Sequence, residues 1–391
     1  MHLQNFSFAL RRPLLAIAVT LTAVALRAEI AVVVNEQKLA LVNGAQRVLS
    51  NPQIGSLSII DLSGPTPRLV AEVEGVPSSM VGPAVSVAVT PDEGLALATG
   101  ANKVDPANPT RQAPDNKLTV VDLKAAPPRV IATLETGPGA SGVSINRAGN
   151  LALVANKGEG TVSVFAIAGK SVTRVGRVQV GTAAAGVNHA IFTPDGKRAL
   201  VTRDGDHMVT MLNVDGQNVT LANRNIRTGL KPYGADVSRD GRMAVVANVG
   251  YLAGDMDTIG VIDLQANPPR TADVVTVGFV PESVRLSPDG TACAVVLQNG
   301  SNRPKDSPFF SPNGKLLMLR VEGLKLTRVA EAPLGSWPQG AVFSADGRTL
   351  LVVNAGNQEV QVFKWDGQTL VDTKQSIKVK GGPAAIATAG R

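Results

Sequence analysis

The sequence predicts an all-β fold, a seven-bladed β-propeller with four antiparallel strands per blade and a ring closed by joining the N- and C-terminal strands. Three observations support this prediction. A short motif centred on a turn glycine recurs along the chain, apolar and polar residues alternate with a period of two around each turn, and no convincing amphipathic helix follows residue 28. Alternation with this period is typical of half-buried strands, so the repeated unit is built from β-hairpins.

The stretch FTPDGKRALVTRDG, residues 192–205, shows the repeated motif: an apolar strand end, a Pro-Asp-Gly turn and a second alternating run. Related stretches place their turn glycines at spacings of 55, 47, 45, 49 and 57 residues, at Gly94, Gly149, Gly196, Gly241, Gly290 and Gly347. A period near 45 residues with additions lies in the range of propeller blades. A seventh, degenerate copy, with Gln37 near its turn position, begins the series 57 residues before Gly94.

Each unit contains four short strands, named A, B, C and D in chain order. The Asp-Gly turn joins A to B, and a second hairpin turn joins C to D, as in VDGQNV at 214–219 and WDGQTL at 365–370. Asp-Gly between alternating runs is a strong hairpin signal, and seven such units in a ring leave only short, protected strand edges. Residues 29–34 and 383–390 both resemble strand A. We therefore expect the two chain ends to pair within one blade, with either of them innermost.

Residues 1–28 have the pattern of a signal peptide that is removed, which leaves residues 29–391 as a single propeller domain. The pair Arg11–Arg12 precedes an apolar stretch, Leu14–Leu26, and Ala28 is a small residue at a plausible cleavage position. This pattern is typical of secretory signals, and the stretch is too short for a lasting membrane span. We expect a periplasmic or secreted bacterial protein without a membrane span, exported by either the general or the twin-arginine route.

The composition argues against several kinds of site. The 391-residue chain is 44% hydrophobic and contains 39 Gly and 25 Pro, as a large core with many tight turns requires. A single cysteine, Cys293, excludes a disulfide framework and a Cys-rich metal site, and we expect it to be a buried, inert thiol. Two histidines remain after residue 28, too few for a His-based metal site. Motifs for phosphate loops, c-type haem and copper are absent from the sequence, so we expect neither metal nor cofactor.

The formal net charge of +7 does not indicate a nucleic-acid partner. The basic residues are scattered over the blades, without a basic run or interleaved aromatic residues. Such a distribution suits solvated blade rims, although a basic protein attracts polyanions non-specifically. We expect no specific nucleic-acid partner and a monomeric protein.

The two faces of a propeller carry different loops. The D–A and B–C connections lie on one face, here called the B–C face, and the A–B and C–D turns lie on the opposite face, here called the A–B face. Four long insertions fall between strands B and C, at 43–56, 100–117, 249–258 and 299–315. Loops that vary on a rigid scaffold commonly carry binding functions. The sequence therefore predicts that a small polar or anionic ligand, or a protein partner, binds to the B–C face.

Alignment of the units brings polar residues to the channel mouth on this face, from the start of strand A and the end of strand B. The catalytic candidates are His189, Arg203 and Glu282. The ligand-binding candidates are Asn188, Tyr233, Gln339, Asp204, Asn248 and Asn299. Together they predict a polar funnel suited to hydrogen bonding. An alternative role for the recurring Asn at the end of strand B is a turn device bonded to nearby backbone, and an alternative role for His189 is structural.

Two stretches, NKGEGTVSVFAI at 156–167 and NAGNQEVQVFKW at 354–365, resemble the YVTN-type propeller repeats of exported bacterial proteins. They are also similar to the lactonase-like propellers, the family of 6-phosphogluconolactonases and carboxymuconate cyclases. In NHAIFTPDGKRALVTRDGDHMV, residues 188–209, His189 sits where that family has a histidine before the strand. At the places where the family's next blade carries Arg-His and Glu, this chain has Tyr233, Gly234 and Val249.

Two functions are therefore expected as alternatives. The first is an exported YVTN-type propeller that binds a ligand or protein through its B–C face without catalysis of its own. The second, implied by the resemblance, is a lactonase- or cycloisomerase-like enzyme acting on a small anionic lactone. In that enzyme His189 would act as the acid or base and Arg203 would hold the anionic substrate.

We predict that export removes the N-terminal segment near Ala28–Glu29, because the small residue Ala28 follows the apolar stretch behind the arginine pair. Mass spectrometry of the protein from a bacterial host that exports it should show a mature chain beginning near Glu29. An intact Met1 in the cytoplasmic fraction would contradict the prediction.

Overall fold

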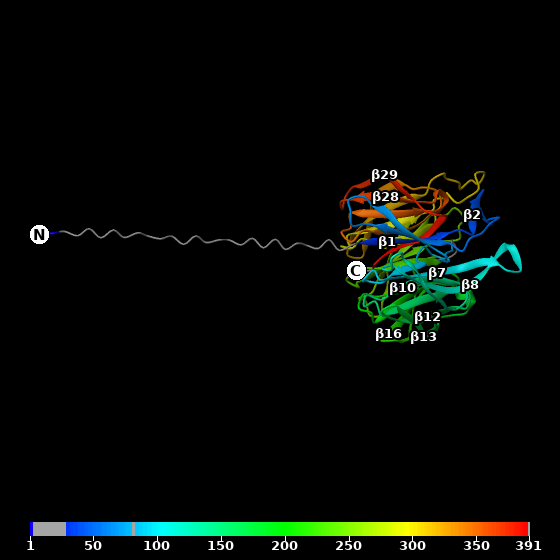
Figure 1. Ribbon diagram of the computed structural model, residues 1–391, viewed down its shortest axis with the longest axis horizontal. Coiled ribbons are helices and arrows are strands. Elements are labelled where there is room, and N and C mark those ends of the chain that lie inside the picture. The colour runs from blue at the N-terminus through cyan, green and yellow to red at the C-terminus, as the bar shows by residue number, and fades with distance from the viewer. Residues whose placement is uncertain (3–28, 80–82, 390–391) are drawn as a thin grey trace.

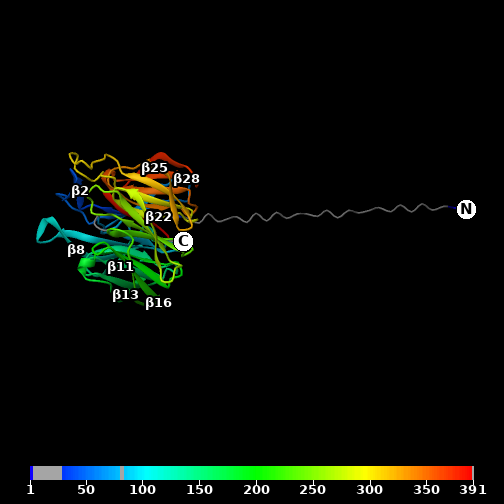
Figure 2. The same cartoon turned by 180° about the vertical axis from the view of Figure 1, so that it is seen from behind.

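The computed structural model describes residues 1–2, 29–79 and 83–389, so the predicted signal peptide lies almost entirely outside the described residues. Seven four-stranded antiparallel sheets follow one another around a ring, which Figure 1 and Figure 2 show from two opposite sides. The only helical elements in the described part of the chain are two 3-10 turns, η1 (Ala183–Ala185) and η2 (Ala355–Asn357). The predicted all-β, seven-bladed propeller is confirmed.

The blades use the strands in chain order, and the first strand of each sheet contacts the first strands of the neighbouring sheets around a common axis. The blade that contains both chain ends has, from the axis outward, β30 (Gly382–Thr388), β1 (Ile30–Glu36), β4 (Ser56–Asp61) and β5 (Arg68–Glu74). The next three sheets are β6 (Val87–Val89), β7 (Leu95–Asp105), β8 (Asn108–Asp122), β9 (Arg129–Glu135); β10 (Ala140–Ile145), β11 (Leu151–Asn156), β12 (Thr161–Ala168), β13 (Ser171–Gln179); and β14 (Val187–Phe192), β15 (Arg198–Arg203), β16 (Met208–Asp215), β17 (Asn218–Ile226). The last three are β18 (Pro232–Val237), β19 (Met243–Asn248), β20 (Asp257–Asp263), β21 (Arg270–Gly278); β22 (Pro281–Leu286), β23 (Ala292–Leu297), β24 (Lys315–Glu322), β25 (Lys325–Pro333); and β26 (Pro338–Phe343), β27 (Thr349–Asn354), β28 (Glu359–Trp365), β29 (Leu370–Lys378).

The ring closes through antiparallel pairing of β30 with β1, with Val33 opposite Ile386. The C-terminal strand is innermost, and β1 is the second strand of its blade. The expectation that residues 29–34 resemble strand A was therefore wrong. The degenerate copy around Gln37 is not an A–B hairpin either, because β2 (Leu39–Val42) and β3 (Ala45–Val48) form a separate two-stranded hairpin inserted between β1 and β4.

All four insertions lie in B–C connections, as predicted. The β2–β3 hairpin is one, and a second prolongs β7 and β8 into a long two-stranded ribbon that ends at Asp105 and Asn108. Figure 1 shows β2 and this ribbon projecting from the same side of the ring. The other two insertions are loops, between β19 and β20 and between β23 and β24.

The core lies between adjacent sheets and is built mainly from aliphatic side chains. One cluster joins the β10–β13 and β14–β17 sheets through Leu153, Val164, Val201 and Leu212, among others. Cys293 is fully buried in β23 within such a cluster, and burial raises the pKa of its thiol, as expected for an inert core residue.

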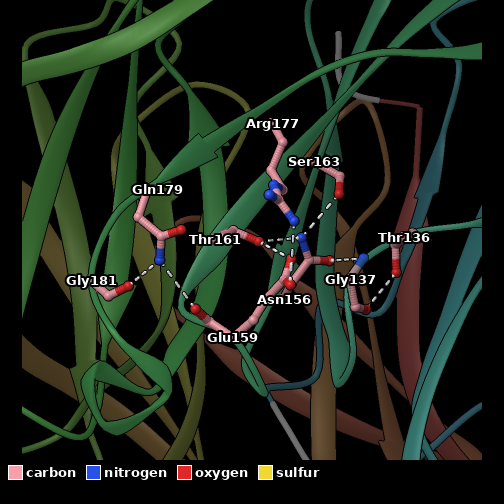
Figure 3. Close-up of polar contacts among 9 residues, drawn as sticks. All are labelled: Thr136, Gly137, Asn156, Glu159, Thr161, Ser163, Arg177, Gln179 and Gly181. Carbon is pink, nitrogen blue, oxygen red and sulfur yellow. Dashed lines mark hydrogen bonds and ion pairs between the residues drawn. The ribbon is translucent and has the colours of Figure 1, made fainter.

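Asn156, at the end of β11, joins three parts of its blade (Figure 3). Its Nδ2 donates to Thr161 Oγ1 and to Ser163 Oγ, both at 2.9 Å, and its Oδ1 accepts from the Gly137 amide at 3.1 Å. The side chain thus ties strand B to strand C and to the preceding D–A loop. Equivalent strand-C hydrogen bonds are made by Asn35, Asn248 and Asn354.

Candidate functional site

A cavity of about 260 Å³ occupies the propeller axis. Residues from the second halves of the inner strands line it, and so do A–B turn residues such as Pro194, Pro288 and Ala345. The cavity therefore faces the A–B side of the ring. The sequence had instead predicted a ligand site at the opposite mouth, on the B–C face.

An ion pair between two inner strands lies in this cavity. Arg285 Nη1 of β22 is 3.6 Å from Asp236 Oδ1 of β18, and Arg285 Nε donates to the Ala341 carbonyl of β26 at 3.3 Å. Asp236 also accepts backbone N–H groups from Leu286 at 2.8 Å and from Val237 at 3.0 Å. Burial raises the pKa of Asp236, and the Arg285 charge opposes that rise. The ion pair and the hydrogen bond to the Ala341 carbonyl together connect three adjacent blades at the axis.

His189, on β14, also lines the cavity and is 3% exposed. Its Nδ1 is buried and has no hydrogen-bond partner among the described residues. Burial, and secondarily the charge on Arg285, lowers the pKa of His189 to about 3. The imidazole is therefore neutral at physiological pH and offers an acceptor or donor according to its tautomer.

The end of the channel toward the B–C face is filled by the chain itself. Pro83, Ala84 and Val85, just before β6, lie against glycines of three inner strands. A Cβ added at Gly142 would lie 3.0 Å from Val85 Cγ2, one at Gly340 would lie 3.2 Å from Ala84 Cβ, and one at Gly234 would lie 3.7 Å from Pro83 Cβ. A Cβ at Gly142 or Gly340 would crowd the crossing segment, whereas one at Gly234 would be in ordinary van der Waals contact with it. Residues 83–85 therefore lie across the mouth where the sequence predicted a polar funnel.

Glu282 is buried near the same mouth and does not line the axial cavity. Its Oε2 accepts from Gln298 Nε2 at 2.7 Å, and Gln298 Oε1 accepts in turn from Asn302 Nδ2 at 2.5 Å. Burial raises the pKa of Glu282 to about 8 despite the hydrogen bond from Gln298. Gln339 is equally buried and donates to the Pro338 carbonyl at 3.3 Å.

Lys157 gathers three of the sequence-predicted residues on the B–C face. Its Nζ lies 2.7 Å from Asp204 Oδ2 and 3.0 Å from Asn188 Oδ1, and 6.0 Å from the centre of the Tyr233 ring. The sequence analysis had missed this lysine, which directly follows the recurring Asn of strand B. A lysine in a B–C loop was the available signal, but its partners come from two other blades.

The remaining predicted residues make hydrogen bonds and ion pairs within their own blades and loops. The Arg203 side chain pairs with Asp206 and donates to Thr210 Oγ1 at 2.9 Å, inside its own blade and away from the axis. Asn248 bonds Thr228 and Thr258, and Asn299 bonds Ser311 and Asn313 within the β23–β24 loop. No hydrogen bond or ion pair among the described residues joins His189, Arg203 and Glu282 to one another.

The insertions on the B–C face pack against each other. Gly44, at the tip of the β2–β3 hairpin, abuts Arg303 and Pro304 of the β23–β24 loop. That loop reaches the β19–β20 loop through a hydrogen bond from Arg303 to the Leu252 carbonyl and through the Phe309 ring against Gly254. Tyr251 in turn lies with its hydroxyl 3.1 Å from His207 Nε2. We call this connected surface the insertion layer; it comprises residues 39–55, 203–208, 249–256 and 298–314.

In the described part of the chain, no group of three or more His, Cys, Asp or Glu residues is placed to hold a metal ion. No helix of that part is long and apolar enough to cross a membrane.

Residues 135–304 match the family described as lactonase, 7-bladed beta-propeller. The chain is a propeller related to the lactonase-like propellers. The resemblance drawn from residues 156–167 and 188–209 is thereby confirmed, and the YVTN-type repeat remains a prediction. No curated protein sequence is significantly similar to this propeller.

Solved structures share the fold over nearly the whole chain. The periplasmic gluconolactonase of Pseudomonas aeruginosa is 19% identical, with a TM-score of 0.69 over 93% of this chain and 99% of the other. A putative 6-phosphogluconolactonase from Bacteroides uniformis is 17% identical, with a TM-score of 0.68 over 93% and 99% of the two chains. A functionally unknown protein from Desulfotomaculum acetoxidans is 15% identical, with a TM-score of 0.66 over 92% and 98%. At these identities the similarity establishes the fold alone.

We predict that Glu282→Gln stabilises the propeller in a pH-dependent way. The pKa of Glu282 is about 8 in the folded protein and about 4.3 for an unfolded glutamate. The folded state therefore holds the proton more tightly, and stability falls as the pH rises from about 4.3 to 8. At pH 8 the variant should melt about 4 °C higher, and at pH 4 it should match the wild type, as thermal unfolding would show. Glu322→Gln, at an exposed position, is the control; the same pH response in both variants would contradict the prediction.

Proposed function

We propose that this propeller is an exported binding protein that holds a protein partner on its B–C face. The observation that carries the proposal is the insertion layer, in which segments from different blades pack into one surface while leaving apolar side chains exposed. Val42 is 55% exposed, Ile54 60%, Tyr251 59% and Met256 64%. Large apolar side chains exposed on a surface built from loops are candidates for contact with a partner.

Contacts between the loops of the layer support recognition. Its loops are joined by the Arg303–Leu252 hydrogen bond, the Phe309–Gly254 contact and the His207–Tyr251 contact. Surfaces fixed before binding lose less conformational entropy on association than free loops do. Basic side chains such as Arg47 and Lys305 lie among the apolar ones in sequence, as in many protein interfaces with a polar rim.

We predict that the combined substitution Val42→Ser, Ile54→Ser and Met256→Ser weakens partner binding at least tenfold, because apolar anchor residues dominate interface energies. The matched control is Val70→Ser, Val274→Ser and Val371→Ser, whose side chains are 49%, 48% and 50% exposed on outer strands. Proteins retained from an extract of the host's exported fraction would be quantified by mass spectrometry. A partner retained by wild type and control but lost by the first variant supports the proposal. Equal retention by all three proteins would refute it.

Lactone hydrolysis is a second candidate, favoured by the family match over residues 135–304 and by the buried His189 with its unpartnered Nδ1 beside a cavity. A neutral imidazole there can accept a proton from water or a substrate hydroxyl. Arg203 does not reach this cavity, so Arg285 would take the role of contacting an anionic substrate.

If lactones are substrates, His189→Ala should lower kcat/KM at least a hundredfold. The wild-type kcat/KM should show no titration near pH 6.5, because it reports the free enzyme, in which the pKa of His189 is about 3. Turnover of sugar and muconate lactones measured between pH 5 and 8 checks both statements. His189→Gln keeps a hydrogen-bonding group and separates loss of chemistry from loss of fold, which a melting curve monitors. Undiminished turnover by His189→Ala would remove this residue from the reaction.

A further inference from the structure

We propose that the axial cavity is a binding site for a small hydroxycarboxylate, entered from the A–B face. The site lies on the opposite side of the ring from the insertion layer, so it does not depend on the proposed partner binding. It requires no lactone turnover either.

The carboxylate partner is Arg285. A guanidinium has five N–H donors, and the contacts of Arg285 with the Ala341 carbonyl and with Asp236 account for only part of them. The contact with Asp236 is long, at 3.6 Å, and the Arg285 side chain is 26% exposed. Donors that face a cavity in a low-dielectric channel bind carboxylates strongly, in a forked geometry. The ion pair with Asp236 therefore holds the guanidinium in place and leaves some of its N–H donors available to a ligand.

The hydroxyl partners are His189 and Asp236. His189 Nδ1 is a buried polar atom without a partner among the described residues, and such an atom costs free energy unless something bonds it. The carboxylate of Asp236 is held by two backbone N–H groups and by Arg285, yet ionised oxygens accept about four hydrogen bonds in total. A ligand with hydroxyl groups beside its carboxylate satisfies both acceptors.

The walls set the size of the ligand. Val87, Val143, Ile191 and Val342 give the cavity an apolar lining from four blades. Its volume of about 260 Å³ is room for about nine water molecules at ~30 Å³ each, and is smaller than the ~300–1,000 Å³ of sites for drug-sized ligands. A compact hydroxy acid therefore fits better than a nucleotide or an oligosaccharide.

The rim carries charges of both signs. Arg147 and Arg239, on A–B turns, line the cavity and are exposed. Two acidic residues line it as well, and both bond backbone amides: Glu29 Oε1 accepts from Ala345 at 2.5 Å and Glu93 Oε1 accepts from Ile30 at 3.3 Å. The charges of these four rim residues balance, so the preference for an anion rests on Arg285 inside the cavity.

The test is binding of L-lactate, D-glycerate and the neutral isostere lactamide to the full chain, measured by calorimetry or ligand-observed NMR. We expect saturable binding of lactate, tighter binding of glycerate because of its added hydroxyl, and at least tenfold weaker binding of lactamide. Arg285→Gln should weaken lactate binding at least tenfold and Arg285→Lys less. Arg242→Gln changes an arginine of the same face that does not line the cavity, and should leave binding unchanged.

Arg285→Gln leaves Asp236 without its ion-pair partner, so a second variant guards against misfolding. Ala387 lines the cavity from β30, and Ala387→Phe would fill it while preserving Arg285 and Asp236. Loss of lactate binding in a folded Ala387→Phe protein supports the site. The proposal is overturned if lactate and lactamide bind equally, or if a folded Arg285→Gln or Ala387→Phe protein binds lactate as the wild type does. Loss of the partner in the insertion-layer variant with lactate binding intact would show that the two surfaces act separately.

Discussion

The pairing of β30 with β1 is the constraint on which the rest of the structure depends. Residues 382–388 must align with residues 30–36 before the seven inner strands can surround one axis. Without this ladder β1 would present an unpaired edge, and the axial cavity would lose one wall. Ala387 and Thr388 of β30 line that cavity next to Val342 of β26 and Val87 of β6. The geometry of the site is thus a consequence of ring closure, and contacts between residues more than 300 positions apart in sequence hold it in place.

Once the ring is closed, packing requirements divide the two faces. At the B–C end, glycines at 142, 234 and 340 leave room for residues 83–85 to cross the channel, and this crossing accompanies the shortening of β6 to Val87–Val89. At the A–B end no such segment crosses among the described residues, and the cavity remains. The B–C face therefore presents a layer built from insertions, whereas the A–B face presents a hollow built from inner strands. One scaffold can carry two binding surfaces because each uses different strands and turns.

The sequence predicted the architecture well because hairpin turns and period-two alternation are local signals. It placed all four insertions on one face, and it placed His189 at the B–C mouth, whereas the side chain lines the cavity that faces the A–B side. The sequence did not predict the contacts of side chains whose direction depends on how the strands pair. Arg203 pairs with Asp206 and Thr210 inside its own blade, which strand position alone does not disclose. Asp236 and Arg285 appear as isolated charges within apolar alternation (GADVS and SVRLS), and only the ring brings them 3.6 Å apart. Residue 37 was misplaced because an inserted hairpin has the same alternation as a blade hairpin.

The electrostatics of the axis favour holding a ligand over transforming one. An efficient general base has a pKa near the working pH, and His189, at about 3, is far below it. Glu282, with a pKa of about 8, is closer to that range, but its carboxylate bonds Gln298 away from the cavity lining. An anion bound beside His189 would raise the pKa of the imidazole. The same anion would also partly offset the charge of Arg285, which helps to lower that pKa. An anionic substrate could therefore restore basicity that the empty cavity lacks, whereas a neutral lactone would not. The charge of the bound molecule, more than the presence of the histidine, decides whether this axis can do chemistry.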